Sequence, residues 1–362
     1  MARTVIPFGP QHPVLPEPIH LSLVLEDERV VEALPTLGYV HRGLELLAAK
    51  RDCTQMIQIV ERVCGICSML HAMCYCQGLE QMLGLEAPRR ARLLRVVWSE
   101  LHRLHSHLLW LGLFADSMGF EALFMQLWKI RERVMDVNEA TTGNRVIVSV
   151  NVIGGVRADL DQGQINWIRE TLVDVEAGIK NLQATIMHDP TVGRRTRGIG
   201  VLGREAAYEL GAAGPTLRGS GWAQDMRQLK YAAFDELDFE PVVETAGDCW
   251  ARGSVRFRES LQSMDLVRQA LGKLEGQGVG GELTVKAKAK PEGEVLTRVE
   301  QPRGECLYYL KGNGTLFLER VRIRTPTFAN IPALTAMLPG LDFADVPVVV
   351  LSIDPCISCT ER

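Results

Sequence analysis

Two pairs of cysteines stand near opposite ends of this 362-residue chain. The first pair is Cys64 and Cys67, the second is Cys356 and Cys359, and each pair has C-x-x-C spacing. Thiolates at this spacing bind zinc, nickel or iron, because all three metals accept soft sulfur ligands. Only three residues follow Cys359, and a tail of that length normally frays. The four cysteines therefore predict a metal site that ties the C-terminal residues into the interior.

Spacing alone leaves the kind of cysteine site open. A structural zinc site is the commonest tetrathiolate site, but zinc ribbons hold their two pairs close together in the sequence. A redox C-x-x-C needs one pair and a thioredoxin-like βαβ pattern, which we do not find. Nine cysteines are an odd number, and no secretory signal is visible, so disulfides are disfavoured. Four further cysteines lack ligand-like spacing and are interpreted as core thiols: Cys74, Cys76, Cys249 and Cys306.

Composition argues against two classes of protein. Hydrophobic residues make up 46% and charged residues 23% of the chain, as in ordinary globular proteins. The net charge of −4 gives no sign of a nucleic-acid partner. No run approaches the roughly 20 apolar residues of a membrane helix, so we expect a chain that does not itself span a membrane.

Most of the elements that must position the cysteines are expected to be helices. Apolar periodicity predicts helices at 43–50, 54–62, from after Cys67 to 83, 88–117, onward to 137, and at 159–187, 204–210, 254–274 and 327–338. Alternating residues predict a hairpin at 19–31 and strands at 295–300, 305–310 and 316–323. We therefore expect a mainly α fold with small β-sheets near both termini (α+β), in a single domain over residues 1–362.

Three segments are expected to be irregular or undecided. The prolines of residues 1–18 exclude a helix and a central strand, which predicts a fixed loop. Residues 188–221 are rich in glycine and arginine and predict a loop apart from the helix at 204–210, and 276–281 predict a glycine-rich turn. The apolar run 347–353 leads directly into Asp354 and the second cysteine pair.

The residues around both cysteine pairs narrow the choice of metal. RVCGIC at 62–67, with His71 four positions later, resembles the first metal motif of the large subunit of nickel–iron hydrogenases, and DPCISCTER at 354–362 resembles the second. Further matches extend across the chain: RGLE at 42–45, RTRGIG at 195–200, RGSG at 218–221 and QPRG at 301–304.

A proline-rich segment near the start of the chain narrows the family. GPQHP at 9–13 is similar to the membrane-bound, energy-converting branch (Ech-type and CO-induced hydrogenases), which is related to the quinone-site subunit of respiratory complex I. That relative lacks the four cysteines, so the sequence favours a hydrogenase over a quinone reductase. The resemblance implies the nickel–iron hydrogenase large-subunit fold, with a long central helix bundle.

The resemblance also implies a cofactor and catalytic residues. All four cysteines would bind nickel, and Cys67 and Cys359 would bridge to an iron that carries CO and cyanide. Glu17, Arg303 and Cys356 would be the catalytic residues. Glu17 matches the proton-transfer glutamate; between Pro16 and Pro18 its carboxylate lies in a rigid loop, where desolvation would raise its pKa. The alternative is a carboxylate that merely accepts nearby amides.

Other residues are expected to surround the cofactor. Arg303 matches the arginine above the open metal position, against the alternative of an ordinary salt-bridged arginine. Thr327 matches a hydroxyl that donates to a cyanide, and His71 is expected to donate to a bridging thiolate, unless it is an ordinary core histidine. Asp354 and Arg62 are assigned to the same surroundings.

Arg362 departs from the family pattern. Many family members have a histidine there and use it with a glutamate like Glu45 to hold magnesium or a second iron, but a guanidinium cannot bind a cation. We therefore doubt that extra metal and expect an Arg362–Glu45 ion pair as a possible replacement. The histidines at 102, 105 and 107 predict no second metal site, and His12, which matches a residue at the complex I quinone head, is given no role.

The predicted function is therefore that of the catalytic subunit of a membrane-associated, energy-converting hydrogenase. The resemblance implies a small subunit with a proximal 4Fe–4S cluster, a ferredoxin-like iron–sulfur subunit, ion-translocating integral membrane subunits and ferredoxin as partners. It places the chain in the cytoplasm, peripheral on the inner face of the cell membrane. The alternatives are a complex I-like quinone oxidoreductase subunit and a structural zinc scaffold.

Overall fold

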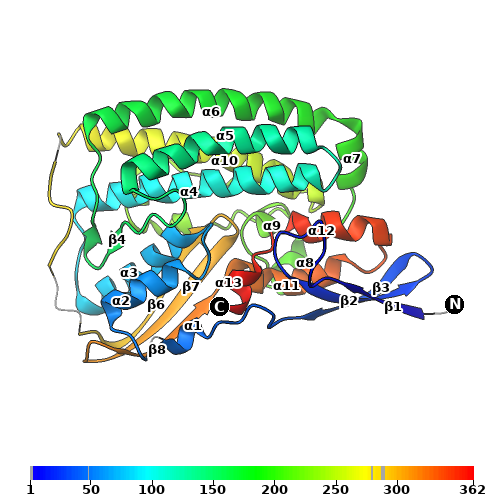
Figure 1. The fold of residues 1–362 in the computed structure, drawn as a ribbon, viewed down its shortest axis with the longest axis horizontal. Coiled ribbons are helices and arrows are strands. Elements are labelled where there is room, and N and C mark those ends of the chain that lie inside the picture. The colour runs from blue at the N-terminus through cyan, green and yellow to red at the C-terminus, as the bar shows by residue number, and fades with distance from the viewer. Residues whose placement is uncertain (1–2, 48, 279, 287–289) are drawn as a thin grey trace.

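The computed structural model describes residues 3–47, 49–278, 280–286 and 290–362. Its long helices lie in one layer, and two small sheets with short helices lie below them (Figure 1). Buried apolar side chains from both layers form one connected core. The mainly α fold with small sheets near the termini and a central helix bundle is confirmed.

The long helices form the bundle: α4 (Arg89–Asp116), α5 (Glu121–Thr142), α6 (Gln162–His188) and α10 (Cys249–Glu275). Aspartate caps shift the start of two of them: α6 begins later than predicted, and α10 begins earlier. Asp161 accepts the Gln164 amide in a capping box and starts α6 at 162 rather than 159. Asp248 accepts the Ala251 amide and starts α10 at 249 rather than 254. Both ends therefore follow local hydrogen bonding more closely than apolar periodicity.

The N-terminal sheet corrects the expectation of a loop over residues 1–18. Strands β1 (Arg3–Phe8), β2 (His20–Glu26) and β3 (Arg29–Thr36) pair antiparallel in the order β1-β2-β3. Pro7 is tolerated because β1 is an edge strand of this sheet. Leu21, Leu23 and Leu25 are buried at every second position of β2, as in a strand with one face on the core. The loop prediction holds only for the residues after β1.

The predicted loop at 188–221 contains two short helices besides α8 (Arg204–Glu209). These are α7 (Pro190–Thr196) and α9 (Pro215–Arg218). Each starts with proline at its first position, where the missing N–H costs nothing. Asp189 also caps α7 by accepting the Thr191 and Val192 amides. The prediction of loop was wrong here because it rested on the glycine and arginine content and did not count proline as a helix start.

The C-terminal sheet carries one side of the site. Strands β6 (Glu292–Gln301), β7 (Gly304–Asn313) and β8 (Leu318–Arg324) pair antiparallel in that order. Arg303 lies in the tight turn between β6 and β7. Gly214 approaches this turn so closely that a β-carbon there would lie 2.3 Å from the Arg303 carbonyl oxygen. Only glycine fits at that position, and its φ of +64° also favours glycine.

Short helices connect the sheets to the cysteines: α1 (Leu44–Leu47), α2 (Cys53–Glu61), α3 (Ser68–Leu83), α11 (Pro326–Met337), α12 (Val346–Ser352) and α13 (Ile357–Glu361). The undecided run 347–353 is helical, in α12. Asp354 has φ +57°, so the chain turns sharply between α12 and the second cysteine pair. Residue 48 of the predicted helix 43–50 and residue 279 of the predicted turn 276–281 lie outside the described residues.

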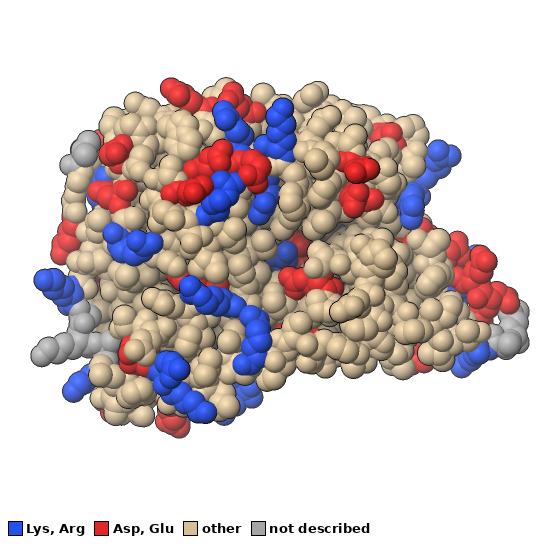
Figure 2. All heavy atoms as spheres, viewed as in Figure 1, with Lys and Arg blue, Asp and Glu red and all other residues tan. Residues whose placement is uncertain are grey.

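Among the described residues, the remaining elements are two short strands and three short 3₁₀ helices. They are β4 (Asn151–Val152), β5 (Gly155–Val156), η1 (Met226–Leu229), η2 (Phe234–Glu236) and η3 (Phe343–Asp345). Acidic and basic side chains mix over the helix bundle on the face in Figure 2. Among the described helices, none is both long and apolar enough to cross a bilayer.

Candidate metal centre

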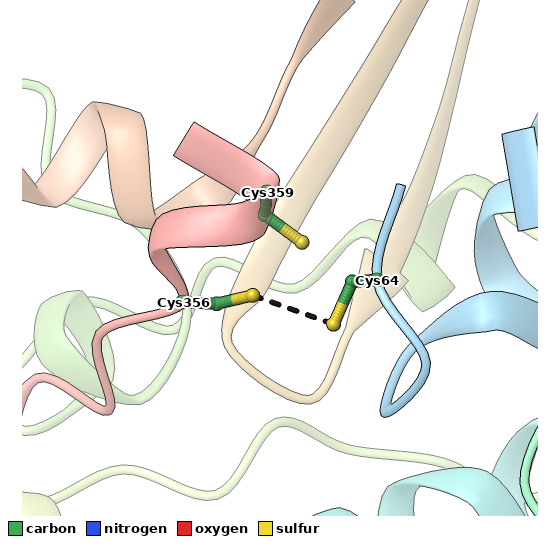
Figure 3. A group of neighbouring side chains, drawn as sticks. All are labelled: Cys64, Cys356 and Cys359. Atoms are coloured by element: carbon green, nitrogen blue, oxygen red, sulfur yellow. Dashed lines mark hydrogen bonds between the residues drawn. The ribbon is translucent and has the colours of Figure 1, made fainter. Parts of the chain in front are cut away.

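The structure brings the four cysteines from opposite ends of the chain together. Cys64 and Cys67 lie in the turn between α2 and α3, and Cys356 and Cys359 lie at and within α13. The Sγ atoms of Cys64 and Cys356 are 3.3 Å apart, and those of Cys67 and Cys359 are 3.5 Å apart. Figure 3 shows the sulfurs of Cys64, Cys356 and Cys359 turned toward one another. All four side chains are buried.

The four thiols suit a metal ion. Four sulfurs at metal–sulfur bonds of about 2.3 Å lie about 3.8 Å apart in a tetrahedron, and the Cys64–Cys356 and Cys67–Cys359 separations are close to this value. The sulfurs of Cys64, Cys356 and Cys359 form one group of neighbouring donors, and Cys67 forms a second group with Cys359 and His71. Burial raises the pKa of Cys67, Cys356 and Cys359. Hydrogen bonds from the Cys356, Cys359 and Cys67 thiols lower the pKa of Cys64. The protein by itself thus stabilises one thiolate, and a bound cation would draw the protons from the other three.

Arg42 joins the two cysteine segments. Its guanidinium donates to the carbonyl oxygens of Arg62 at 2.8 Å, Val63 at 2.9 Å and Ser358 at 2.6 Å. Two of these carbonyls precede Cys64, and the third lies between the cysteines of the second pair. Sequence reasoning noticed the RGLE match but assigned Arg42 no role, because bonds to carbonyl groups leave no side-chain partner to recognise. Arg42 therefore positions both cysteine pairs.

Glu17 reaches the second cysteine pair through Ser358. Its carboxylate accepts the Ser358 amide at 2.7 Å and the Ser358 hydroxyl at 3.4 Å. Burial raises the pKa of Glu17, and the negative Cys64 adds to this, while the Ser358 amide works against both. The carboxylate does accept a neighbouring amide, as the simpler interpretation held. Its raised pKa is also what a proton relay requires.

Residues near Glu17 enclose a surface cavity of about 510 Å³, lined by residues 10–13 and 15–18. His12 lies on this cavity, with its ring centroid 4.4 Å from that of Phe8. The Nδ1 atom of His12 accepts the Val14 amide at 3.3 Å. Glu17 therefore lies between this cavity and the cysteines.

Arg303 and Asp354 form a buried pair beside the thiols. The Arg303 Nε donates to the Asp354 carbonyl at 2.9 Å, and a second guanidinium nitrogen lies 2.8 Å from the Asp354 carboxylate. Burial works to lower the pKa of Arg303, but Asp354 and the nearby cysteines outweigh it and raise this pKa. One guanidinium nitrogen and one carboxylate oxygen of the pair have no partner among the described residues. The salt bridge therefore leaves a cationic donor unused.

Thr327 and His71 each contact one cysteine of the second pair: Thr327 contacts Cys356, and His71 contacts Cys359. The Cys356 amide donates to the Thr327 hydroxyl at 3.1 Å, which leaves the hydroxyl hydrogen available to an acceptor. The His71 Nε2 lies 3.5 Å from the Cys359 sulfur, and its Nδ1 lies 2.7 Å from the hydroxyl of Tyr308. Burial lowers the pKa of His71 to about 4, so the ring is neutral at pH 7. Tyr308 was missed because an inward-facing residue of β7 looks like ordinary core.

Arg62 is the one expected site residue whose side chain points elsewhere. Its side chain is 56% exposed, and its guanidinium donates to the Gln58 carbonyl at 2.7 Å. Its link to the site is through its backbone, whose carbonyl accepts the bond from Arg42.

The ion pair expected at the C-terminal residue is present. The Arg362 Nε lies 2.9 Å from the Glu45 carboxylate, which also accepts the Ile323 amide and pairs with Arg322. Burial works to raise the pKa of Glu45, but these three donors lower it. The carboxylate is therefore already occupied by cations and an amide.

The predicted core thiols Cys74, Cys76, Cys249 and Cys306 are all buried. Of the three histidines on α4, His105 lies 3.1 Å from the Ile66 carbonyl oxygen and His107 lies 2.8 Å from the Glu259 carboxylate. Within the described residues, the groups able to hold a metal ion are the two that contain cysteines of the pairs.

Comparison with known proteins decides the family. Residues 117–287 and 282–362 match the family described as "Respiratory-chain NADH dehydrogenase, 49 Kd subunit", and residues 42–114 match "Nickel-dependent hydrogenase". The chain belongs to this family of hydrogenase and complex I subunits. The two matches divide the site, because the first cysteine pair lies in the hydrogenase segment and the second in the other.

Individual relatives extend over the whole chain. The carbon monoxide-induced hydrogenase of Rhodospirillum rubrum is 42% identical over 371 residues, which covers 100% of both chains. The membrane-bound hydrogenase subunit alpha of Pyrococcus furiosus is 38% identical, over 99% of this chain and 87% of its own. An NAD(P)H-quinone oxidoreductase subunit of Gloeobacter violaceus is 34% identical, over 99% and 98%. The resemblance to the membrane-bound, energy-converting branch and its complex I relatives is confirmed, and the chain is an oxidoreductase-family protein.

Proposed function

We propose that this chain is the catalytic subunit of a membrane-associated, energy-converting nickel–iron hydrogenase. Its reaction is the interconversion of hydrogen with protons and electrons, linked to ferredoxin and coupled to ion translocation. The observation that carries the proposal is the convergence of four buried thiols from opposite ends of the chain, with sulfurs 3.3 and 3.5 Å apart within the two cross-pairs.

The chain's own residues suit the nickel–iron group. Cys64, Cys67, Cys356 and Cys359 would hold nickel, and Cys67 and Cys359 would also hold iron. Two metals can share a thiolate because its sulfur has several lone pairs. The bound group, with CO and cyanide on the iron, would supply the redox and hydrogen-splitting chemistry. Thr327 has a free hydroxyl hydrogen to donate to a cyanide.

Four further residues would move charge, stabilise it or position a charged group. Arg303 keeps a buried cation beside the thiols, with one nitrogen free to face the reacting hydrogen. Glu17 would exchange protons between the Cys356–Cys359 segment and the adjacent cavity, supported by its bond to Ser358. His71, neutral at pH 7, would donate from Nε2 to the Cys359 sulfur and adjust its basicity. Asp354 would hold Arg303 in place.

The proposed partners follow from the reaction and from the relatives. A small subunit with a proximal 4Fe–4S cluster and a ferredoxin-like subunit would carry electrons to ferredoxin, because this chain has no ferredoxin-like cysteine run. Integral membrane subunits would translocate ions. This part of the proposal is supported by the relative described as a membrane-bound hydrogenase subunit. The chain would thus sit on the cytoplasmic face of the membrane as one domain. Magnesium or a second iron beside Arg362 is not part of the proposal.

A complex I-like quinone oxidoreductase subunit is the second candidate. It is favoured by the 49 Kd match over two segments and by the cavity at residues 10–18, on which His12 lies. A quinone site needs no thiols, so this candidate leaves the four buried cysteines unexplained.

Infrared spectroscopy on the anaerobically purified complex tests the proposal. CO and cyanide on iron absorb where proteins do not, so we expect these bands together with stoichiometric nickel and hydrogen-dependent dye reduction. A complex with quinone reduction but neither nickel nor these bands would favour the second candidate. Stoichiometric zinc without hydrogen-dependent dye reduction would instead indicate a structural scaffold.

A further inference from the structure

A second polar site lies in the interior, where α4, α9 and α10 meet the end of β6. It consists of three arginines and four carboxylates, which we call the buried charge cluster: Glu100, Arg103, Arg218, Asp225, Arg227, Glu259 and Glu300. Each of these residues is at most 1% exposed. Burying so many charges is costly unless each is paired, so the pairing shows what the cluster does.

Arg218 is the centre of the cluster. Its guanidinium lies 2.8 Å from Glu259, 2.8 Å from Glu300 and 3.3 Å from Asp225. Arg227 then pairs with Asp225 at 2.8 Å and Glu100 at 3.1 Å. Three carboxylates on one guanidinium give more negative than positive charge around it. The cluster is therefore continuous from α9 to α4.

The charges of the cluster do not balance. Four acids face three arginines, and the neighbouring His107 is neutral at pH 7 because burial lowers its pKa to about 4. Arg256 also interacts with Glu259, although it forms no ion pair with the cluster among the described residues. With every acid ionised, three carboxylates of the cluster share Arg218, and one added proton relieves this crowding of negative charge.

Glu300 is the member placed to hold that proton. Burial and then Asp225 raise its pKa to about 7, against Arg218. The pKa values of Asp225 and Glu259 are instead lowered, since the arginines outweigh burial there. The charged or titratable groups that face Glu300 are Arg218 of α9, Asp225 before η1, Arg103 of α4, and Tyr231, whose hydroxyl accepts the Glu300 amide at 3.1 Å.

The cluster is connected to the metal centre along the backbone and through Arg256. Glu300 is three residues before Arg303, and Arg103 donates to the Glu300 carbonyl at 2.7 Å. Arg256 of α10 interacts electrostatically with Asp354 beside the thiols and with Glu259 in the cluster. Burial lowers the pKa of Arg256 to about 10, and these two carboxylates oppose that shift. Arg256 therefore lies between the two polar sites.

Polar atoms between the two sites have no protein partner in the described part of the chain. They are Nε and one terminal nitrogen of Arg256, both amide atoms of Gln301, Nδ1 of His107, and the free atoms of Arg303 and Asp354. Buried polar atoms in native proteins are bonded to protein or to internal water. Arg256 interacts with both sites, and Gln301 lies between Glu300 and Arg303 in the sequence, so water bound by these two residues would connect the sites.

We propose that the buried charge cluster is a proton-binding site, centred on Glu300, which exchanges its proton with the metal centre through water held along Arg256 and Gln301. The proton leaves the Glu300 carboxyl as a carboxylate forms and returns by the same route, with no change in electron count. The exchange rests on the proposed function, because that reaction consumes and releases protons at the thiols. The proton-binding site itself does not.

Infrared pH titration of the purified complex tests the site. We expect an infrared band of a protonated carboxyl group that shifts in D₂O. This band should titrate between about pH 5 and pH 9, on either side of the raised pKa of Glu300. Glu300→Gln should lose this band and still fold, because the amide matches the neutral carboxyl in shape. Glu305→Gln is the matched control, since Glu305 lies on the same hairpin and pairs with Arg324 and Arg298 outside the cluster.

The exchange has its own readout. When dithionite reduces the complex, we expect the midpoint of the band to shift in the unmodified protein and in Glu305→Gln. A band that survives Glu300→Gln, or the absence of any titrating band, overturns the proton site, whatever the metal content. A midpoint that does not move on reduction overturns the exchange with the metal centre. A titrating band in a complex without nickel would contradict the proposed function and leave the proton site intact.

Discussion

The metal centre and the buried charge cluster are both polar and buried, but they are built in opposite ways. The metal centre comes from turns and the last residues of the chain, and Arg42 holds its two halves by backbone carbonyls. The charge cluster comes mainly from helices, and its side chains hold one another by ion pairs. The candidate metal centre is therefore held by bonds to the backbone, whereas the cluster is held by ion pairs between side chains.

Cys67→Ser should have the largest effect, because it removes a ligand that no neighbour replaces. We expect loss of nickel and of hydrogen-dependent activity, with α3 and the helix bundle still folded. Metal analysis, dye reduction and circular dichroism measure these three properties. Cys76→Ser is the control, since Cys76 is a buried thiol of α3, the helix that follows Cys67, and lies outside the candidate ligand groups. Retained turnover in Cys67→Ser would contradict the metal centre.

Arg218→Met should be the most damaging change in the charge cluster. It leaves three carboxylates without their shared cation, and breaking a buried ion pair on one side costs about 3–5 kcal/mol. Chemical denaturation of the chain measures the loss of stability. The control is Arg133→Met on α5, which removes an exposed pair with Asp174. Equal stability of the two variants would mean that the cluster is not a cohesive unit.

Glu17→Gln should lower proton transfer at the candidate metal centre without changing how much metal it binds. We expect the nickel content to be unchanged, because the amide oxygen can still accept the Ser358 amide. The rate at which the enzyme exchanges hydrogen isotopes between hydrogen gas and water should fall by about 10²-fold, since a proton relay of this kind contributes about that much to the rate. Glu32→Gln on β3 serves as the exposed control. Undiminished isotope exchange in Glu17→Gln would refute the relay role.

Glu45→Gln should have the smallest effect, because Glu45 lies at the edge of the metal centre. The pKa of Glu45 is lowered in the folded chain, so its pairing stabilises the protein above the ordinary carboxyl range and is lost as the pH falls through the lowered value. We expect a loss of about 0.5–1 kcal/mol at pH 7 that vanishes in acid. Thermal unfolding at several pH values measures this. A difference that persists in acid would show that Glu45 acts by packing and not by charge.

The two regions also differ in how far the sequence predicted them. C-x-x-C spacing fixes ligand type locally, so the four cysteines were found from the sequence, and the mainly helical fold followed from apolar periodicity. Short helices such as α7 were not predicted because the loop prediction rested on glycine and arginine content, although Asp189 and Pro190 are a local signal for a helix start. Arg42 and Tyr308 escaped because their partners are far away in the sequence.

The sequence by itself determined the residue types of the candidate metal centre: four cysteines, a carboxylate between prolines and an arginine between two strands. Only the tertiary structure decided the buried charge cluster, since Arg218 and Glu300 lie far apart in the sequence and charged residues are normally expected at the surface. The physical reason is that ligand identity resides in residue type, whereas the cost or benefit of a buried charge depends on which neighbours the fold supplies.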